Sequence, residues 1–174
     1  MKEIEIGYSN EEVKARIKEV AEEISRDYAG EDIMLVGVLT GSLYFLTELS
    51  QNITLPQEID TMKTSSYVGT ESTGRILVTK DVDRPIRGRN VIVVEDIVDT
   101  GQTLHMVCAM LKKEGPKSLR VASLLDKPSR RVVDFKADYV GFEIPDKFVV
   151  GWGLDYNQKY RELPYIGFIK ETEE

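Results

Sequence analysis

Residues 91–104 constrain the fold more than any other segment of this chain. Val91–Val94 are four β-branched residues in a row, and three carboxylates follow within Glu95–Asp99. Because the apolar run is not interrupted by polar residues, it predicts a strand that is covered on both faces, as in a parallel sheet, and that ends at Glu95. Apolar residues then recur at helical spacing, at Leu104, Val107, Cys108 and Leu111. Residues 99–103 are therefore expected to form the turn that enters a helix.

The turn itself has the composition of a phosphate-binding loop. It consists of Asp99 followed by Thr100, Gly101, Gln102 and Thr103. Backbone amides at a helix N-terminus, two hydroxyls and a glycine can surround an anion. No lysine follows Gly101, so the loop is not that of a nucleoside triphosphatase. Glu95 and Asp96 would repel a phosphate, and they are expected to accept hydrogen bonds from sugar hydroxyls or to hold Mg²⁺.

The first half of the chain alternates between helix and strand signals. Ser9 and Glu12 form a capping-box pattern, which predicts a helix over residues 10–28 that Gly30 ends. A buried strand is expected over Ile33–Leu39, followed by a Thr40-Gly41-Ser42 turn and a helix to about Ser50. These alternating elements predict an α/β fold with a mostly parallel twisted sheet flanked by helices.

The remaining segments complete this expectation. Residues 59–66 and 118–125 are expected to be strands, and residues 67–75, rich in glycine, serine and threonine, a loop. Beyond residue 125 the chain has short strand signals with glycines and aromatics, including residues 139–145, which predict a small irregular lobe. We expect one domain over residues 1–174, with a core of about 30–125 and a lobe of about 126–174 that includes N-terminal contributions.

Composition excludes several classes of protein. With 174 residues, 30 acidic and 23 basic, the chain carries a net charge of −7, which disfavours a nucleic-acid-binding surface. Local basic patches are left open at two clusters: Arg84, Arg87 and Arg89, and Lys127, Arg130 and Arg131. The single cysteine, Cys108, excludes an internal disulfide and is expected to be a buried thiol. Without a signal-peptide pattern or a long apolar run, a cytoplasmic location and no membrane segment are expected.

The segment Val91–Thr103 closely resembles the signature with which type I phosphoribosyltransferases bind phosphoribosyl diphosphate (PRPP). The resemblance implies that family's fold, with a small base-binding hood, and PRPP and Mg²⁺ as substrate and cofactor. It implies that Glu95 and Asp96 bind the ribose or Mg²⁺ and that residues 100–103 bind the 5-phosphate. Asp99 would be the catalytic general base near purine N7.

A second resemblance concerns the acceptor base. Residues 124–128 and 141–161 are similar to the base-binding half of the hypoxanthine-guanine phosphoribosyltransferases. The resemblance implies that Lys127 donates to the purine O6, which distinguishes 6-oxopurines from adenine. Phe148 would stack on the purine and the Val149 backbone would bond its pyrimidine edge. Taken singly, Lys127 could be an exposed lysine, and Phe148 and Val149 could be core.

The same resemblance assigns the pyrophosphate side of the site. Asp155 would contact a second Mg²⁺, although its sequence context also fits an ordinary turn. Arg161 would bind pyrophosphate, Lys147 would help to close the base pocket, and Thr40, Gly41 and Ser42 would position pyrophosphate through their backbone. Many family members have lysine where this chain has Thr40, so a cis Thr40-Gly41 bond is a hypothesis only. Ser66 and Tyr67 would begin a lid over residues 67–75, for which an exposed hairpin is the alternative.

The expected reaction transfers ribose 5-phosphate from PRPP to N9 of hypoxanthine or guanine and releases pyrophosphate. Two alternatives stay open from the residues. One is a PRPP-sensing regulator that binds nucleic acid on the same fold. The other is a transferase for adenine or a pyrimidine, which fits the signature but not Lys127. A homodimer or homotetramer is implied by the resemblance alone.

Overall fold

The computed structural model describes residues 2–66 and 76–170. The three α-helices in these ranges are α1 (Asn10–Asp27), α2 (Leu43–Asn52) and α3 (Gln102–Lys113), and a short 3₁₀ turn, η1, spans Pro128–Arg130. The strands are β1 (Ile4–Tyr8), β2 (Ile33–Leu39), β3 (Gln57–Ser66), β4 (Ile76–Lys80), β5 (Asn90–Val98), β6 (Ser118–Asp126), β7 (Tyr139–Glu143), β8 (Val149–Val150) and β9 (Ile166–Ile169). Tyr67 and the predicted lid over residues 67–75 lie outside the described residues.

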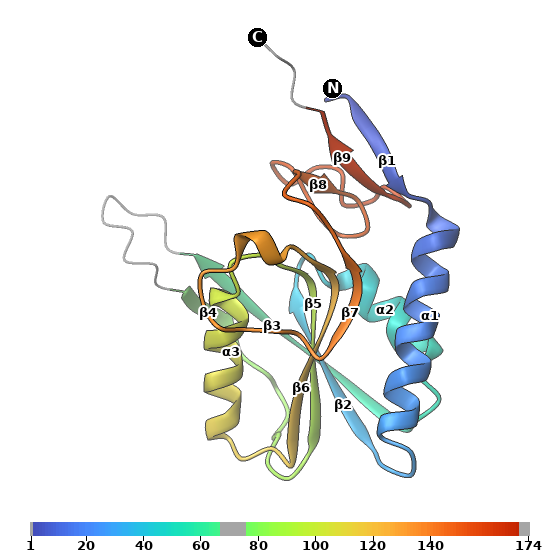
Figure 1. The fold of residues 1–174 in the computed structure, drawn as a ribbon. Helices are drawn as coiled ribbons and strands as arrows, with labels where there is room; N and C mark the ends of the chain where they lie inside the picture. The colour runs from blue at the N-terminus through green and yellow to red at the C-terminus, as the bar shows by residue number, and fades with distance from the viewer. Residues whose placement is uncertain (1, 67–75, 171–174) are drawn as a thin grey trace.

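A six-stranded sheet forms the centre of the molecule, in the order β4-β3-β2-β5-β6-β7 (Figure 1). Neighbouring strands are parallel except β3 and β4, which are antiparallel. The predicted α/β class with a mostly parallel sheet is therefore confirmed. Because all the parallel strands run the same way, the turns after β2, β5 and β6 gather at one edge of the sheet, where ligands bind in such folds.

Both faces of this sheet are covered, as the apolar run in β5 predicts. Side chains alternate along β2, so that Leu35 packs with α1 and α2 in one core while Val36 packs with α3 in the other. Ile92 and Val93 of β5 divide in the same way. The start of α1 has the predicted capping box, in which the Glu12 amide donates to Ser9 Oγ at 3.2 Å and the Ser9 amide to Glu12 Oε2 at 2.7 Å.

A second sheet of three short antiparallel strands, in the order β1-β9-β8, lies above the carboxyl edge of the main sheet. We call this sheet, together with the loop 151–165 between β8 and β9, the hood. Its core residues, among them Trp152 and Ile166, pack in the same cluster as the α1 side of the main sheet. The hood therefore joins a strand from the start of the chain to strands from its end, and it places loop 151–165 over the site edge.

Two predictions from the sequence are wrong, one about the end of a strand and one about the sheet to which a strand belongs. β5 does not end at Glu95 but continues to Val98, so Glu95 and Asp96 project from an extended strand. β7 was expected in the irregular lobe, but it pairs in parallel with β6 and completes the main sheet. The glycine that made β7 resemble lobe sequence is required there, because a Cβ on Gly141 would lie 2.4 Å from the Leu124 carbonyl oxygen.

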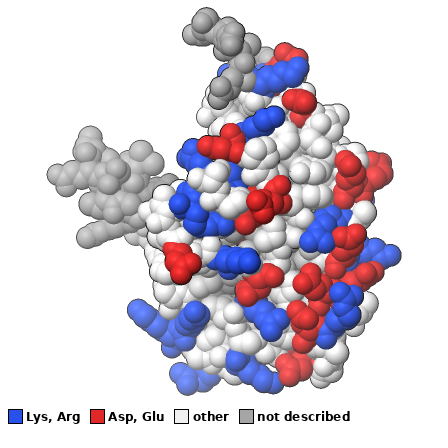
Figure 2. Space-filling view, viewed as in Figure 1, with Lys and Arg blue, Asp and Glu red and all other residues white. Residues whose placement is uncertain are grey.

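The charged surface offers no basic stripe on the face shown in Figure 2, where lysines and arginines alternate with acidic residues. Arg84 and Arg89 both contact Glu58, and Arg130 lies 3.7 Å from Asp146. Most of the basic candidates named from the sequence thus have acidic partners. Among the helices in the described parts of the chain, none is long and apolar enough to cross a membrane.

Candidate active site

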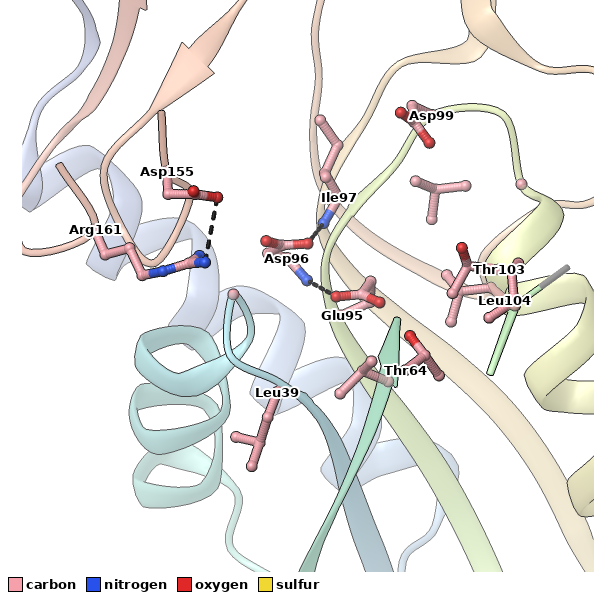
Figure 3. A pocket seen from close by; sticks show the side chains of 15 residues that line it. Leu39, Thr64, Glu95, Asp96, Ile97, Asp99, Thr103, Leu104, Asp155 and Arg161 are labelled. Atoms are coloured by element: carbon pink, nitrogen blue, oxygen red, sulfur yellow. Dashed lines mark hydrogen bonds and ion pairs between the residues drawn. The ribbon is translucent and has the colours of Figure 1, made fainter. Parts of the chain in front are cut away.

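A cavity of about 320 Å³ opens at the carboxyl edge of the main sheet (Figure 3). It receives side chains from β5, the start of α3, the turn after β2 and the hood loop. The lining residues predicted from the sequence are Gly41, Glu95, Asp96, Asp99, Gly101, Thr103, Asp155 and Arg161. Residues that lie more than 100 positions apart in the chain therefore meet around one space, as the phosphoribosyltransferase resemblance implies.

Glu95 and Asp96 form an acidic pair on the floor of the cavity. Glu95 is buried, and burial raises its pKa well above the usual range, with further repulsion from Asp96 and Asp99. Burial also raises the pKa of Asp96, although its hydrogen bonds and the charge of Arg161 act in the opposite direction. In Figure 3 the two carboxylates project beside each other from β5. Apart from the charge of Arg161 acting on Asp96, neither carboxylate has an ion-pair partner among the described residues, and the pair is suited to a cation or to hydroxyl donors.

Two glycines allow the turn after β2 to pack closely against the acidic pair and the hood. A Cβ on Gly41 would lie 1.8 Å from Asp96 Oδ2, and a Cβ on Gly153 would lie 2.0 Å from the Gly41 carbonyl oxygen. The cis peptide bond in this turn joins Leu39 to Thr40, one residue before the position hypothesised from the sequence. Neither residue is proline, so the sequence carries no local signal for its position.

The loop after β5 has the geometry predicted for an anion-binding turn. Gly101 adopts the left-handed conformation with φ of 82° and precedes the first residue of α3. The first hydrogen bond of the helix ladder runs from the His105 amide to the Gly101 carbonyl oxygen at 2.9 Å. The amides of residues 101–104 precede this ladder, and those of Gly101, Thr103 and Leu104 have no partner among the described residues, whereas the Gln102 amide donates to Thr100 Oγ1 at 3.4 Å. The Thr100 amide donates to Asp99 Oδ1 at 2.7 Å.

The hood loop contributes an ion pair on the opposite side of the cavity. Arg161 lies 3.3 Å from Asp155 and donates to the Gly153 carbonyl oxygen at 2.6 Å. The Gln158 amide in turn donates to Asp155 Oδ2 at 2.8 Å, which fixes that carboxylate. As Figure 3 shows, Arg161 and Asp155 face Asp96 across the cavity. The Arg161 guanidinium and the Asp155 carboxylate therefore lie together on this side of the cavity, as a site for an anion together with a bound cation would require.

The predicted base-recognition residues do not line this cavity, and two of them, Lys147 and Phe148, line a separate one with Asp146 and Phe168. Lys127 is only 12% exposed, which excludes an ordinary surface lysine, and its ammonium donates to the Lys147 carbonyl oxygen at 2.9 Å. Phe148 is 52% exposed and meets Tyr156 edge to face, with ring centroids 5.3 Å apart. Val149 is buried in β8. The side chain of Lys147 points elsewhere, with its ammonium 5.5 Å from the centroid of the Phe168 ring.

The other predicted residues occupy supporting positions. Thr100 and Gln102 belong to the loop, but neither lines the cavity, and Gln102 is exposed. Ser42 is buried with no partner for its hydroxyl among the described residues, and Thr40 lies in the turn after β2. Ser66 is the last residue of β3.

The sequence did not identify several residues that shape the site. Thr64, Ile76 and Leu104 line the cavity, and only Leu104 had a signal, as part of the α3 core stripe. Gly153 could have been suspected from the two glycines that flank Trp152. Arg131, a candidate for a local basic patch, pairs with Asp126 and donates to the Asp99 carbonyl oxygen. Asp126 ends β6 and Asp99 lies in the loop after β5, 32 positions from Arg131, so sequence periodicity could not reveal the second contact.

Comparison with known proteins shows the family to which the chain belongs. Residues 6–157 match the phosphoribosyl transferase domain family. The chain is 49% identical to a hypoxanthine-guanine phosphoribosyltransferase of Streptococcus mutans over 165 residues, which cover 94% of this chain and 92% of that protein. It is 47% identical to a hypoxanthine phosphoribosyltransferase of Escherichia coli strain K12, with 95% of both chains covered. The chain belongs to the phosphoribosyltransferase family, in its hypoxanthine-guanine branch.

Solved structures agree with this membership. A hypoxanthine-guanine phosphoribosyltransferase of Bacillus anthracis superposes with a TM-score of 0.92 at 46% identity, covering 97% of this chain and all of that one. As a phosphoribosyltransferase, the chain has its signature loop, acidic pair and hood in one continuous site. The relatives named here are transferases, so the nucleic-acid-binding regulator has no support among them.

Proposed function

We propose that this chain transfers the 5-phosphoribosyl group from PRPP to N9 of hypoxanthine or guanine, giving IMP or GMP and pyrophosphate. The observation that carries the proposal is the cavity in which the acidic pair of β5, the loop before α3 and the Asp155–Arg161 pair meet. The names of the close relatives support the same reaction. On this basis residues 1–174 act as one unit, with core and hood each supplying half of the site.

The substrate PRPP fits the polarity of the cavity. We assign the 5-phosphate to the loop from Thr100 to Thr103, which lies at the helix N-terminus and whose Gly101 and Thr103 line the cavity. The ribose hydroxyls would donate to Glu95 and Asp96, two carboxylates whose burial raises their pKa. Pyrophosphate would lie between Arg161 and the backbone of the Thr40–Ser42 turn. This order places the anomeric carbon near the centre of the cavity.

The donor set also fits Mg²⁺. Among the described residues no group of three or more acidic, histidine or cysteine residues forms a complete metal site. Carboxylate pairs with open positions are nevertheless the usual partners of Mg²⁺, which takes its other ligands from substrate phosphates and water. We assign Glu95, Asp96 and Asp155 to this role. When bound, Mg²⁺ neutralises the charge that develops on pyrophosphate.

In the transfer step, the bond from the anomeric carbon to pyrophosphate breaks before the bond to the purine is complete. Arg161 stabilises the charge that the leaving pyrophosphate gains. Asp99, exposed on the cavity edge, is placed to accept or share the proton at purine N7, which strengthens N9 as a nucleophile. Lys127 donates to O6, and the exposed Phe148 ring provides the stacking surface, with Val149 and Lys147 beside it.

A direct assay tests the proposal. The protein is incubated with PRPP, Mg²⁺ and, in separate reactions, hypoxanthine, guanine, xanthine, adenine and uracil, and nucleotide formation is measured. We expect product from hypoxanthine or guanine and at most a trace from adenine and uracil. A matched reaction with excess EDTA should be inactive, since Mg²⁺ is required. Absence of product from every purine would overturn the proposed function.

For the assembly, we propose a homodimer or homotetramer, because four large apolar side chains of α2, β3 and β4 are more than 40% exposed: Leu43, Tyr44, Ile59 and Leu77. Light scattering coupled to gel filtration measures the mass directly, and a monomer at micromolar concentration would contradict this. The buried free thiol of Cys108 fits a reducing compartment, and we propose the cytoplasm.

A further inference from the structure

The chain that follows β6 packs along the outer side of the phosphate loop. Three backbone groups of residues 98–100 are bonded in succession by this segment. The Lys127 amide donates to the Val98 carbonyl oxygen at 2.8 Å, Arg131 Nη1 to that of Asp99 at 2.7 Å, and the Val132 amide to that of Thr100 at 3.0 Å. The loop therefore has a continuous brace on the side away from the cavity, and Arg131 is its only side-chain member.

The guanidinium of Arg131 is itself held in place. Its Nη2 lies 2.5 Å from Asp126 Oδ1, at the end of β6, and the two side chains are only 16% and 12% exposed. Ion pairs with this degree of burial and a direct hydrogen bond have a defined geometry, unlike exposed pairs. The planar guanidinium thus links the end of β6 to the backbone of Asp99, and it holds the loop from the side away from the cavity.

Bonding the carbonyls outward determines where the amides point. In a trans peptide the C=O and the N–H project in opposite directions. Because the carbonyls of Asp99 and Thr100 are held by the outer segment, the amides of Thr100 and Gly101 face the opposite side, where Gly101 and Thr103 line the cavity. The Thr100 amide donates there to Asp99 Oδ1, whereas the Gly101 amide has no partner among the described residues. The side-chain position of Gly101 also faces outward, since a Cβ there would lie 3.0 Å from Arg131 Cδ.

We propose that Arg131, oriented by Asp126, is a positioning residue that prepares the Gly101 amide to receive the 5-phosphate of PRPP. The inference rests on the proposed function and deepens it. Arg131 touches no substrate and acts through the backbone of Asp99. Since the Gly101 amide lies at the N-terminus of α3 and must point into the cavity to meet an anion, losing the brace costs phosphate affinity even though every phosphate-binding group is still present.

The test uses ribose 5-phosphate, which carries the 5-phosphate but neither pyrophosphate nor base. Its affinity is measured by calorimetry for the wild type, Arg131→Met and Arg131→Lys. We expect Arg131→Met to weaken binding by about tenfold or more, the effect of losing a charged hydrogen bond. Arg131→Lys, with one point charge in place of the planar fork, should be intermediate. In kinetics, KM for PRPP should rise while KM for hypoxanthine changes by less than about twofold.

Arg130 provides the matched control. It is in the same segment and has the same charge, but its side chain is 53% exposed and contacts Asp146 rather than the loop. Arg130→Met should bind ribose 5-phosphate as the wild type does. If Arg131→Met does not fold, Asp126→Asn tests the inference in its place. It removes the charge of the partner but preserves its shape, and it should weaken ribose 5-phosphate binding by at least about twofold.

Two negative results have different meanings. Equal affinity of the wild type and of the folded Arg131 or Asp126 variants for ribose 5-phosphate would overturn the inference alone. Failure of the wild type to bind either ribose 5-phosphate or PRPP would overturn the proposed function, and the inference with it.

Discussion

Asp99 is the single residue on which the chemistry of the proposed reaction depends most. It lies at the mouth of the cavity, where its carboxylate accepts a hydrogen bond from the Thr100 amide. Replacing it with asparagine keeps the shape and removes the base. We expect Asp99→Asn to lower kcat on the order of 10²-fold, the size of a general-base contribution, while PRPP still binds. Steady-state kinetics with a PRPP binding measurement checks this, and undiminished turnover would remove Asp99 from the role.

Lys127 determines the choice of base in the proposed site. Its ammonium is 2.9 Å from the Lys147 carbonyl oxygen and 3.9 Å from Asp146, so it is oriented before a purine arrives. Lys127→Ala removes one charged donor, worth about 1.5–3 kcal/mol, so KM for hypoxanthine should rise at least about tenfold and the preference over adenine should weaken. Lys113→Ala, an exposed lysine at the end of α3, is the control. An unchanged preference would assign selectivity to another group.

At the scale of elements, the site depends on close approach between loops that belong to different sheets. Gly153 has φ of 97°, and a Cβ there would lie 2.0 Å from the Gly41 carbonyl oxygen. Gly30 has φ of 81° with nothing within 4 Å of such a Cβ. Both alanine variants incur backbone strain of about 1–2 kcal/mol, but only Gly153→Ala separates the hood from the turn after β2.

The two variants therefore separate the effect of the contact between the loops from the effect of backbone strain. Chemical unfolding should show a loss of stability in both, larger in Gly153→Ala. Activity should fall sharply in Gly153→Ala and remain at the wild-type level in Gly30→Ala. Similar activity losses in both would indicate that backbone strain, rather than the contact between the loops, governs the site.

Elements with a complete local signal could be predicted, and those defined by distant partners could not. α1 has its capping box and apolar spacing within one segment, and β2 has a continuous apolar run. β7, by contrast, resembles irregular sequence until it pairs with β6, because Gly141 is required by the neighbouring Leu124 carbonyl. The acidic pair of β5 and the loop after it could likewise be predicted from local sequence. Arg131 could not, because it acts on Asp99, which only the fold brings near.

At the scale of the whole molecule, one buried thiol links stability to pH. Burial raises the pKa of Cys108 from 9.0 to about 11. Below about pH 9 the thiol is protonated in both folded and unfolded chains. Between the two pKa values the thiol of the unfolded chain loses its proton while that of the folded chain keeps it. The free energy of unfolding should therefore decrease as pH rises.

A variant isolates this contribution from other groups that titrate in alkali. Urea unfolding of wild type and Cys108→Ala is compared at about pH 8 and at about pH 10.5. Alanine lowers stability at both values because the side chain is shortened in the α3 core. The decrease between the two pH values should nevertheless be smaller in Cys108→Ala, and equal decreases would show that the thiol does not contribute.

The pairing of β1 with β9 has a consequence for how the protein is made. The two strands come from nearly opposite ends of the sequence: Ile4 pairs with Ile169, and next to this pair Lys170 bonds Glu3, 167 positions away. On the ribosome, the main sheet can be synthesised through β7 while β1 still has no partner. The hood is then completed only when the last strand emerges, so a nascent chain has the elements assigned to the sugar phosphate before the proposed site for the base is closed.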